Sequence, residues 1–240
     1  MLPYKNEFDR FAKYYLTHNQ LQQEIAKNLL RFHSDFSATI LDLGCGGGAI
    51  FKELEASFDP YHFIVGVDNA PNMCTLHPVH DKATILCESF DDKELFEKLH
   101  KAYNKFDLII SSSSLQWSKN LEKLVENMTL VGDNILIAIF TDKTFASLFQ
   151  ALGIKSKLSS STEILDTFRY SYDIENTEIS TYEKHFDTTH ELLTFIKKMG
   201  ISGGKKTAPL KEILKIRKND TITTLEFEVL FFRASLRKNT

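Results

Sequence analysis

The stretch ILDLGCGGGAIF, residues 40–51, decides the fold of this chain. Its apolar start is typical of a buried strand, its four glycines of a tight turn, and the segment that follows, through KELEASF, of a helix. A turn without side chains lets backbone N–H groups and the start of the helix approach a ligand closely. We therefore expect a small-molecule site here, against the alternative of a tight turn that binds nothing.

The spacing of the glycines fits two classes of cofactor. Gly44, Gly46 and Ala49 match the G-x-G-x-x-A pattern of dinucleotide sites. The same glycines, together with Asp42 and Gly48, match the acidic residue and G-x-G-x-G of S-adenosylmethionine enzymes. Asp42 favours the second class, because it has no evident role beside a pyrophosphate but suits the positively charged methionine portion of S-adenosylmethionine.

Strand and helix patterns alternate on both sides of this turn. Apolar runs predict strands at 38–45, 63–68, 83–89, 106–113 and 134–140, and helical spacing predicts helices at 8–32, 47–58, 91–103 and 120–128. Beyond 140 we expect a helix at 144–154, a serine-rich segment of weak periodicity at 155–172, a strand at 178–186, a helix at 189–200 and a final strand at 223–236. This order predicts a doubly wound α/β sheet, mostly parallel and seven-stranded, with helices on both faces and an antiparallel final strand.

Length and composition are those of one globular domain of 240 residues, 42% hydrophobic and 25% charged. We expect an N-terminal helical lid at 1–35, a cofactor-binding core at 36–141, an excursion over the sheet edge at 142–190, and the last helix and strand at 191–240. The net charge of -3 predicts no attraction to nucleic acid or to a membrane surface, and the sequence suggests neither a signal segment nor a membrane span. The three cysteines form no Cys-x-x-Cys pair, so we expect no metal site and a cytoplasmic location.

Polar residues at the carboxyl ends of the predicted strands complete the expected cleft, because doubly wound sheets bind ligands there. Asp68 ends the second strand, where an acid can hydrogen-bond both hydroxyls of a ribose, and Glu88 near the end of the third can lie close to an adenine. After the fourth strand, the run from Ser111 to Trp117 borders the cleft, with Gln116 and Trp117 as its large side chains. The alternative is that Trp117 packs in the core and Gln116 caps the next helix.

Four segments together resemble a known family. FDRFAKYYLTHNQLQ, ILDLGCGGG, VGVDNAPNM and FDLIISSSSLQWSKNLEKLVENM look like the malonyl-acyl-carrier-protein O-methyltransferases of biotin synthesis, which are class I methyltransferases with a Rossmann-like fold. The resemblance covers residues 8–140 well and the end of the chain more loosely. The Leu-Gln-Trp motif is shared in part with trans-aconitate methyltransferases, which also esterify a carboxylate. The usual Lys-Pro-Gly-Gly before the fifth strand is replaced here by LVGDN.

The resemblance implies S-adenosyl-L-methionine as the cofactor and the free carboxylate of malonyl-acyl carrier protein, or of malonyl-CoA, as the methyl acceptor. It implies that Tyr15 closes over the cofactor, that Gln22 helps to hold it, and that Gln116 and Trp117 shape the site of transfer. The expected catalytic residues are thus Tyr15, Gln116 and Trp117. The expected cofactor contacts are Tyr15, Gln22, Asp42, Gly44, Cys45, Gly46, Asp68, Asn69, Met73, Glu88, Ser89 and Ser111.

The acceptor carboxylate needs a partner, for which Arg169, Lys205 and Lys206 are candidates. Acyl carrier proteins are acidic, so the basic segment from Lys205 to Lys218 is a candidate docking surface, and a solvated helix face is the alternative. Two other functions stay open: methylation of a free small carboxylic acid such as trans-aconitate, and a non-catalytic cofactor-binding or assembly protein on the same fold.

Overall fold

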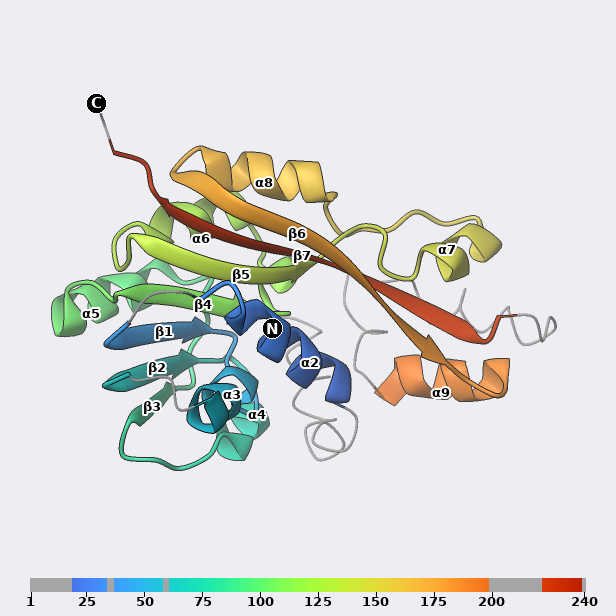
Figure 1. The fold of residues 1–240 in the computed structure, drawn as a ribbon, viewed down its shortest axis with the longest axis horizontal. Helices are drawn as coiled ribbons and strands as arrows, with labels where there is room; N and C mark the ends of the chain where they lie inside the picture. Colours follow the sequence, from blue (N-terminus) through green and yellow to red (C-terminus); the bar gives the residue numbers. More distant parts are fainter. Residues whose placement is uncertain (1–18, 34–36, 58–60, 199–221, 239–240) are drawn as a thin grey trace.

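The computed structural model describes residues 19–33, 37–57, 61–198 and 222–238, which fold around one seven-stranded sheet (Figure 1). Its strands lie in the order β3-β2-β1-β4-β5-β7-β6. Their bounds are β1 (Thr39–Leu43), β2 (Phe63–Val67), β3 (Ala83–Leu86), β4 (Leu108–Ser112), β5 (Asn134–Phe140), β6 (Tyr172–His185) and β7 (Thr224–Leu236).

The first five strands pair in parallel, and β7 runs antiparallel between β5 and β6. This confirms the predicted sheet and its antiparallel final strand. The strand order reverses at β1, which pairs with β2 on one side and with β4 on the other. In such sheets the crevice for a ligand opens at the carboxyl ends of the two strands that flank this reversal.

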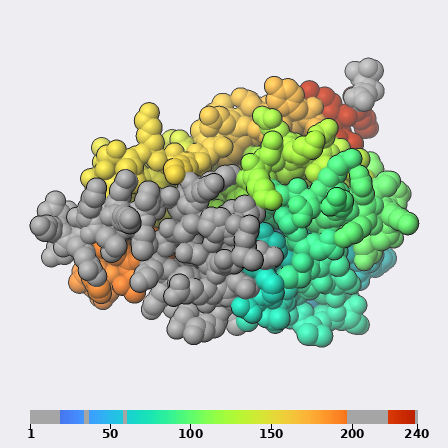
Figure 2. Space-filling model, turned by 180° about the vertical axis from the view of Figure 1, so that it is seen from behind, coloured from blue at the N-terminus to red at the C-terminus, as the bar shows by residue number. Residues whose placement is uncertain are grey.

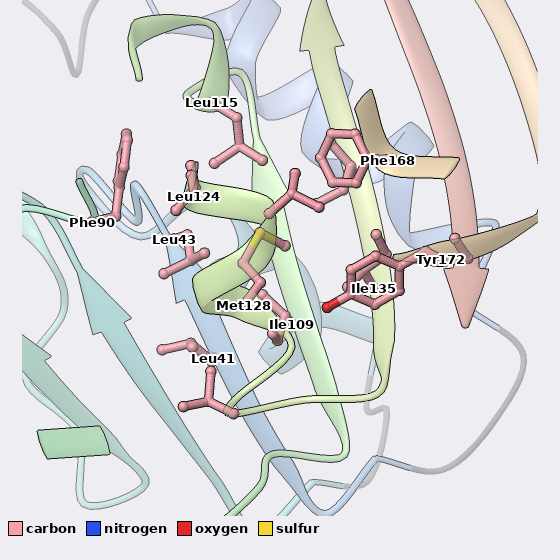
Figure 3. Packing of buried hydrophobic residues seen from close by; sticks show 14 of the residues in the cluster. Leu41, Leu43, Phe90, Ile109, Leu115, Leu124, Met128, Ile135, Phe168 and Tyr172 are labelled. Carbon is pink, nitrogen blue, oxygen red and sulfur yellow. The ribbon is translucent and has the colours of Figure 1, made fainter. Parts of the chain in front are cut away.

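Helices cover both faces of the sheet (Figure 1). Alternation along β1 directs Leu41 and Leu43 to one face, where they pack in one cluster with residues of α6 and α8 (Figure 3) and of α5, and Ile40 to the other, where it packs with α2 and α3. The bounds are α2 (Gln20–Leu30), α3 (Ala49–Ser57), α4 (Pro71–Leu76), α5 (Lys93–Tyr103), the short 3₁₀ helix η1 (Leu115–Trp117), α6 (Leu121–Met128), α7 (Ala146–Leu152), α8 (Ser161–Arg169) and α9 (Thr189–Lys198).

The part of the chain after β5 differs from the expectation in two elements, α8 and β6. The serine-rich segment contains α8, a helix that its weak periodicity did not predict. Ser160 and Glu163 form a capping box at its start, and Ile164 and Phe168 bury its apolar side in the core. Seen from behind, the segments drawn in teal and green occupy the right side of the molecule, and the described residues after β5 lie mainly along its top and left (Figure 2).

The strand β6 begins at Tyr172, earlier than predicted. Tyr172 is fully buried and its hydroxyl donates a hydrogen bond to the Gly132 carbonyl oxygen, at 3.3 Å, just before β5 begins (Figure 3). The end of α8 and the start of β6 are therefore tied to the amino edge of the parallel strands.

No helix of the described residues is long and apolar enough to span a membrane.

Candidate active site

The glycine turn between β1 and α3 has the backbone geometry for which glycine is required. Gly44, Gly46 and Gly48 have φ angles of +80°, +50° and +76°, in the region that L side chains rarely adopt. The N–H groups of Gly44 and Cys45 both donate to the Val67 carbonyl oxygen, at 2.7 and 3.0 Å, which ties the turn to the end of β2. The predicted tight turn is confirmed at the carboxyl edge of the sheet.

Two of these glycines also make room for protein side chains. A Cβ atom on Gly44 would lie 2.1 Å from Ser114 Oγ, and one on Gly48 would lie 2.9 Å from His77 Nε2. Both distances are far below van der Waals contact. The loop after β4 and the segment after α4 therefore pack directly on the turn, so the missing side chains serve close packing as well as access for a ligand.

The Asp68 carboxylate is hydrogen-bonded to two backbone segments at the predicted ribose position. Its Oδ2 accepts a hydrogen bond from the Gly46 N–H at 3.0 Å, and its Oδ1 accepts one from the Ala70 N–H at 2.9 Å. Each carboxylate oxygen has a second lone pair, which a ribose hydroxyl can use. The structure thus fixes the Asp68 carboxylate between the glycine turn and the start of α4.

Asp42 is the least satisfied charged group of the described residues. It is 1% exposed, and neither carboxylate oxygen has a hydrogen-bond partner among the described residues. Burial, and secondarily the charge of Asp68, raise the pKa of Asp42 from 3.8 to about 8. A buried carboxylate without a partner is costly, and a cationic ligand group would remove that cost. The site therefore fits the cationic methionine end of S-adenosylmethionine.

Two further polar groups lie on the same side of the sheet as Asp42. The register pairs Asp42 with Ile110, so alternation places Ser112 on the Asp42 face, which α2 covers. Phe32 and His33, just beyond α2, line a cavity with residues that begin β4, so the Gln22 end of α2 lies toward the carboxyl edge. Gln22 Oε1 and Ser112 Oγ are buried with no hydrogen-bond partner in the described part of the chain.

The serine run after β4 anchors that loop to β1. The hydroxyls of Ser111 and Ser114 both lie within hydrogen-bonding distance of the Leu43 carbonyl oxygen, at 2.6 and 2.7 Å. Ser113, between them, has φ +59°, which is uncommon outside glycine. Strained residues of this kind cluster at functional sites. Ser111, near the carboxyl end of β4, lies at the predicted edge of the cleft, and its hydroxyl is bonded to the Leu43 carbonyl oxygen.

Gln116 and Trp117 form η1 together with Leu115, directly after this loop. Gln116 is buried and its Nε2 donates to the Ser113 carbonyl oxygen at 2.7 Å. Asn120, and not Gln116, caps the next helix, because its Oδ1 accepts from the Lys123 N–H at 3.0 Å. Trp117 is half-buried and does not belong to the apolar clusters that the described residues form. The alternative of a capping glutamine and a core tryptophan is therefore wrong.

The other predicted cofactor residues gather along the same edge. Met73 is buried against Ala70, Asn69 is half-buried beside Asp68, and Cys45 packs on Gly66. Glu88 Oε2 pairs with Lys98 Nζ on α5 at 2.9 Å, and its expected place near the adenine stays a prediction. The Ser89 hydroxyl accepts from the Asp91 N–H at 3.2 Å, within its own turn.

Several predicted residues lie outside the described residues: Tyr15, Lys205, Lys206 and the basic segment from Lys205 to Lys218. Arg169 is described, and its candidacy as the partner of the acceptor carboxylate is wrong. It ends α8, beside the start of β6 at the amino edge of the sheet, and its Nη1 pairs with Asp166 Oδ1 at 2.8 Å. The glycine turn lies at the opposite edge.

The sequence placed Ser112, Ser113 and Ser114 in the run that borders the cleft, but it gave them no separate roles. The run of four serines at the end of a predicted strand was the available signal, because short polar residues at that position are unusual in a buried strand. Their separate roles depend on contacts with Leu43 and Gln116, which no local pattern reveals.

Comparisons with known proteins agree with this geometry. Residues 40–131 match the protein family described as Methyltransferase domain. Five similar proteins are named malonyl-[acyl-carrier protein] O-methyltransferase. The Bacillus cereus protein is 28% identical over 224 residues, which cover 83% of this chain and 77% of the relative. The Acetivibrio thermocellus protein is 28% identical over 246 residues, with coverage of 87% and 83%.

Solved structures show the same fold at lower identity. An S-adenosylmethionine-dependent methyltransferase from Anabaena variabilis superposes with a TM-score of 0.62 at 11% identity, over 99% of this chain and 98% of that chain. The YcgJ protein of Bacillus subtilis gives 0.63 at 13%, over 89% and 99%. The class I methyltransferase fold and the resemblance to the malonyl-acyl-carrier-protein O-methyltransferases are thus confirmed. The match of residues 40–131 to a methyltransferase domain agrees with S-adenosyl-L-methionine as the cofactor.

Proposed function

We propose that this methyltransferase esterifies the free carboxylate of a malonyl thioester, carried by acyl carrier protein or by coenzyme A. The relatives with this name cover most of the chain, which supports the proposal. The observation that carries it is the position of Gln116 and Trp117. The Leu-Gln-Trp motif, one of the segments that carry the resemblance, lies in η1, directly after β4, at the edge that also holds Asp42 and the glycine turn.

The cofactor supplies an electrophilic methyl group, so the acceptor has to supply only a nucleophilic oxygen. A malonyl carboxylate has a pKa of about 4 and is ionised at neutral pH, so no general base is needed. The task of the protein is to hold one carboxylate oxygen in line with the methyl group and to exclude water. Positioning of this kind contributes up to about 7–11 kcal/mol to catalysis.

The residues of the edge divide this task in our proposal. Asp42 faces the cationic end of the cofactor, and Asp68 accepts from the ribose hydroxyls. Gln116, held through Nε2 by the Ser113 carbonyl oxygen, and Trp117 form the wall against which the malonyl group lies. Tyr15 closes the cleft from the N-terminal segment. Each of these residues positions a reactant, and none transfers a proton.

Esterification removes the negative charge of the malonyl carboxylate. The product then resembles an apolar acyl primer, which is the form that an enzyme extending fatty acids accepts. In the family that this chain resembles, the step begins the pimeloyl part of biotin, and we propose the same place for this protein. The basic segment from Lys205 to Lys218 is our candidate landing surface for an acidic carrier protein.

One experiment tests both the reaction and the acceptor. The protein is incubated with S-adenosylmethionine and, separately, with malonyl-acyl carrier protein, malonyl-CoA and trans-aconitate, and each product is weighed for the gain of one methylene. We expect the gain on a malonyl thioester. A gain on trans-aconitate alone would reassign the enzyme to free carboxylic acids, and no gain on any acceptor would favour a non-catalytic assembly protein.

A variant separates positioning of the acceptor from binding of the cofactor. Replacing Gln116 by alanine should lower kcat/KM for the malonyl thioester while the Kd of S-adenosylhomocysteine stays near that of the wild type. A matched control is Lys123→Gln, an exposed change on α6. Equal kinetics of the Gln116 variant and the control would remove Gln116 from the acceptor wall.

A further inference from the structure

Two cysteines meet at the residue that fixes the ribose position. Val67 pairs with Leu86 in the β2–β3 ladder, and the Asp68 N–H donates to the Leu86 carbonyl oxygen at 3.1 Å. Cys87, the next residue after β3, therefore lies beside Asp68. Cys74, one turn into α4, donates its thiol proton to the Asp68 carbonyl oxygen at 3.4 Å, so both cysteines lie against the Asp68 backbone.

The two thiols differ in access. Cys87 is exposed and Cys74 is half-buried, whereas the third cysteine, Cys45, is buried against Gly66. Within the described ranges, no group of three histidine, cysteine or acidic side chains is arranged to hold a metal ion.

We propose that Cys74 and Cys87 form a reversible disulfide on reaction with a hydroperoxide, and that this oxidation weakens binding of the cofactor. The reaction joins α4 to the end of β3 at the point where both contact Asp68. The proposal concerns cofactor binding alone, so it does not depend on the identity of the methyl acceptor.

The chemistry balances with hydrogen peroxide as the oxidant. The exposed Cys87 sulfur attacks one peroxide oxygen; an S–O bond forms, the O–O bond breaks, and the leaving oxygen departs as water, giving a sulfenic acid. The Cys74 sulfur then attacks the Cys87 sulfur; the S–S bond forms, and the sulfenic oxygen leaves as a second water with the Cys74 proton. Burial raises the pKa of the Cys74 thiol, which therefore keeps its proton until this second step.

Oxidation removes one contact that holds the cofactor site. As a disulfide, Cys74 has no proton to donate, so the Asp68 carbonyl oxygen loses that hydrogen bond. The Asp68 carboxylate accepts hydrogen bonds from the N–H groups of Gly46 and Ala70. Its position therefore depends on the Asp68 backbone, which the Cys74 thiol helps to hold. Loss of one hydrogen bond of typical net strength predicts a Kd for the cofactor product that is higher by about three- to tenfold.

The test treats the full chain with hydrogen peroxide, blocks the remaining thiols with an alkylating reagent, and measures mass, disulfide peptides and the Kd of S-adenosylhomocysteine by calorimetry. We expect a mass lower by two hydrogen atoms before alkylation, two fewer alkylated cysteines after it, a Cys74–Cys87 peptide, weaker binding, and recovery of both mass and affinity with a dithiol reductant. Oxidation without this peptide, or this disulfide with an unchanged Kd, would overturn the proposal.

Two variants at one position separate the thiol proton from the disulfide. Cys74→Ser keeps a donor for the Asp68 carbonyl oxygen but cannot form the bond, so its Kd should equal that of the reduced wild type and should not respond to peroxide. Cys74→Ala lacks the donor and should bind as weakly as the oxidised wild type. A Cys74→Ser variant that still loses affinity in peroxide would locate the sensitive residue elsewhere.

Discussion

Replacing Asp42 by asparagine should stabilise the cofactor-free protein, and should do so more at pH 7 than at pH 5. Asp42 is buried without a partner among the described residues, and burial, with a smaller contribution from the charge of Asp68, raises its pKa from 3.8 to about 8. Between these two pH values the native state keeps a proton that the unfolded chain has released. Raising the pH through this window therefore removes stability.

The size of the effect follows from the shift. Each pH unit inside the window costs about 1.4 kcal/mol, so the wild type should lose about 3 kcal/mol between pH 5 and pH 7 through this one group. Asparagine does not ionise, so the variant escapes this loss. The difference in unfolding free energy between variant and wild type should thus be larger by about 3 kcal/mol at pH 7.

Urea unfolding followed by circular dichroism at both pH values measures this difference. Asp166→Asn, which removes an exposed carboxylate on α8, is the matched control for loss of one acidic group. The same Asp42 variant should bind S-adenosylhomocysteine more weakly by about 1.5–3 kcal/mol, the usual worth of a hydrogen bond to a charged group. An equal stability difference at pH 5 and pH 7 would refute the reasoning.

Four other changes have defined outcomes. Gly44→Ala should cost about 1–3 kcal/mol in urea unfolding, because its φ is +80° and its Cβ would lie 2.1 Å from Ser114 Oγ; unchanged stability would contradict the geometry. Tyr15→Phe should lower kcat more than it raises the Kd of the cofactor product, and an unchanged kcat would remove Tyr15 from the mechanism. Arg169→Gln should leave KM for a malonyl thioester unchanged; a raised KM would restore its candidacy. Ser160→Ala should cost about 1 kcal/mol of unfolding free energy through the lost cap of α8, and a loss near zero would contradict the role of that cap.

The sheet could be predicted because its signals are local. A buried parallel strand is a short apolar run, and 63–67 and 134–140 are of this kind. The helix α8 has a weaker signal, because Ile164 and Phe168 are its fully buried side chains, and its capping box was the feature that could have revealed it. The first half of β6 is largely exposed, so its apolar pattern does not mark where the strand begins.

The candidate site also has residues that local patterns predict and contacts that they do not. Asp42, Gly44, Gly46 and Asp68 are carried by two strand ends whose patterns are local, and the structure brings these residues together at one edge. The space that a side chain on Gly44 would need is occupied by Ser114, which lies far away in the sequence. A contact of this kind depends on the register of β1 with β4, and no single stretch of sequence contains that register.

The polar groups on the α2 side of the sheet argue for a ligand rather than for packing. A buried carboxylate without a partner costs free energy, and an apolar side chain at position 42 would give a more stable empty fold. Gln22 Oε1 and Ser112 Oγ, which are neutral, carry smaller costs of the same kind on the same side, among the described residues. A protein that retains three such groups at the carboxyl edge gains from what binds there. The gain in unfolding free energy that we expect from Asp42→Asn thus measures how much the unpaired Asp42 destabilises the cofactor-free protein.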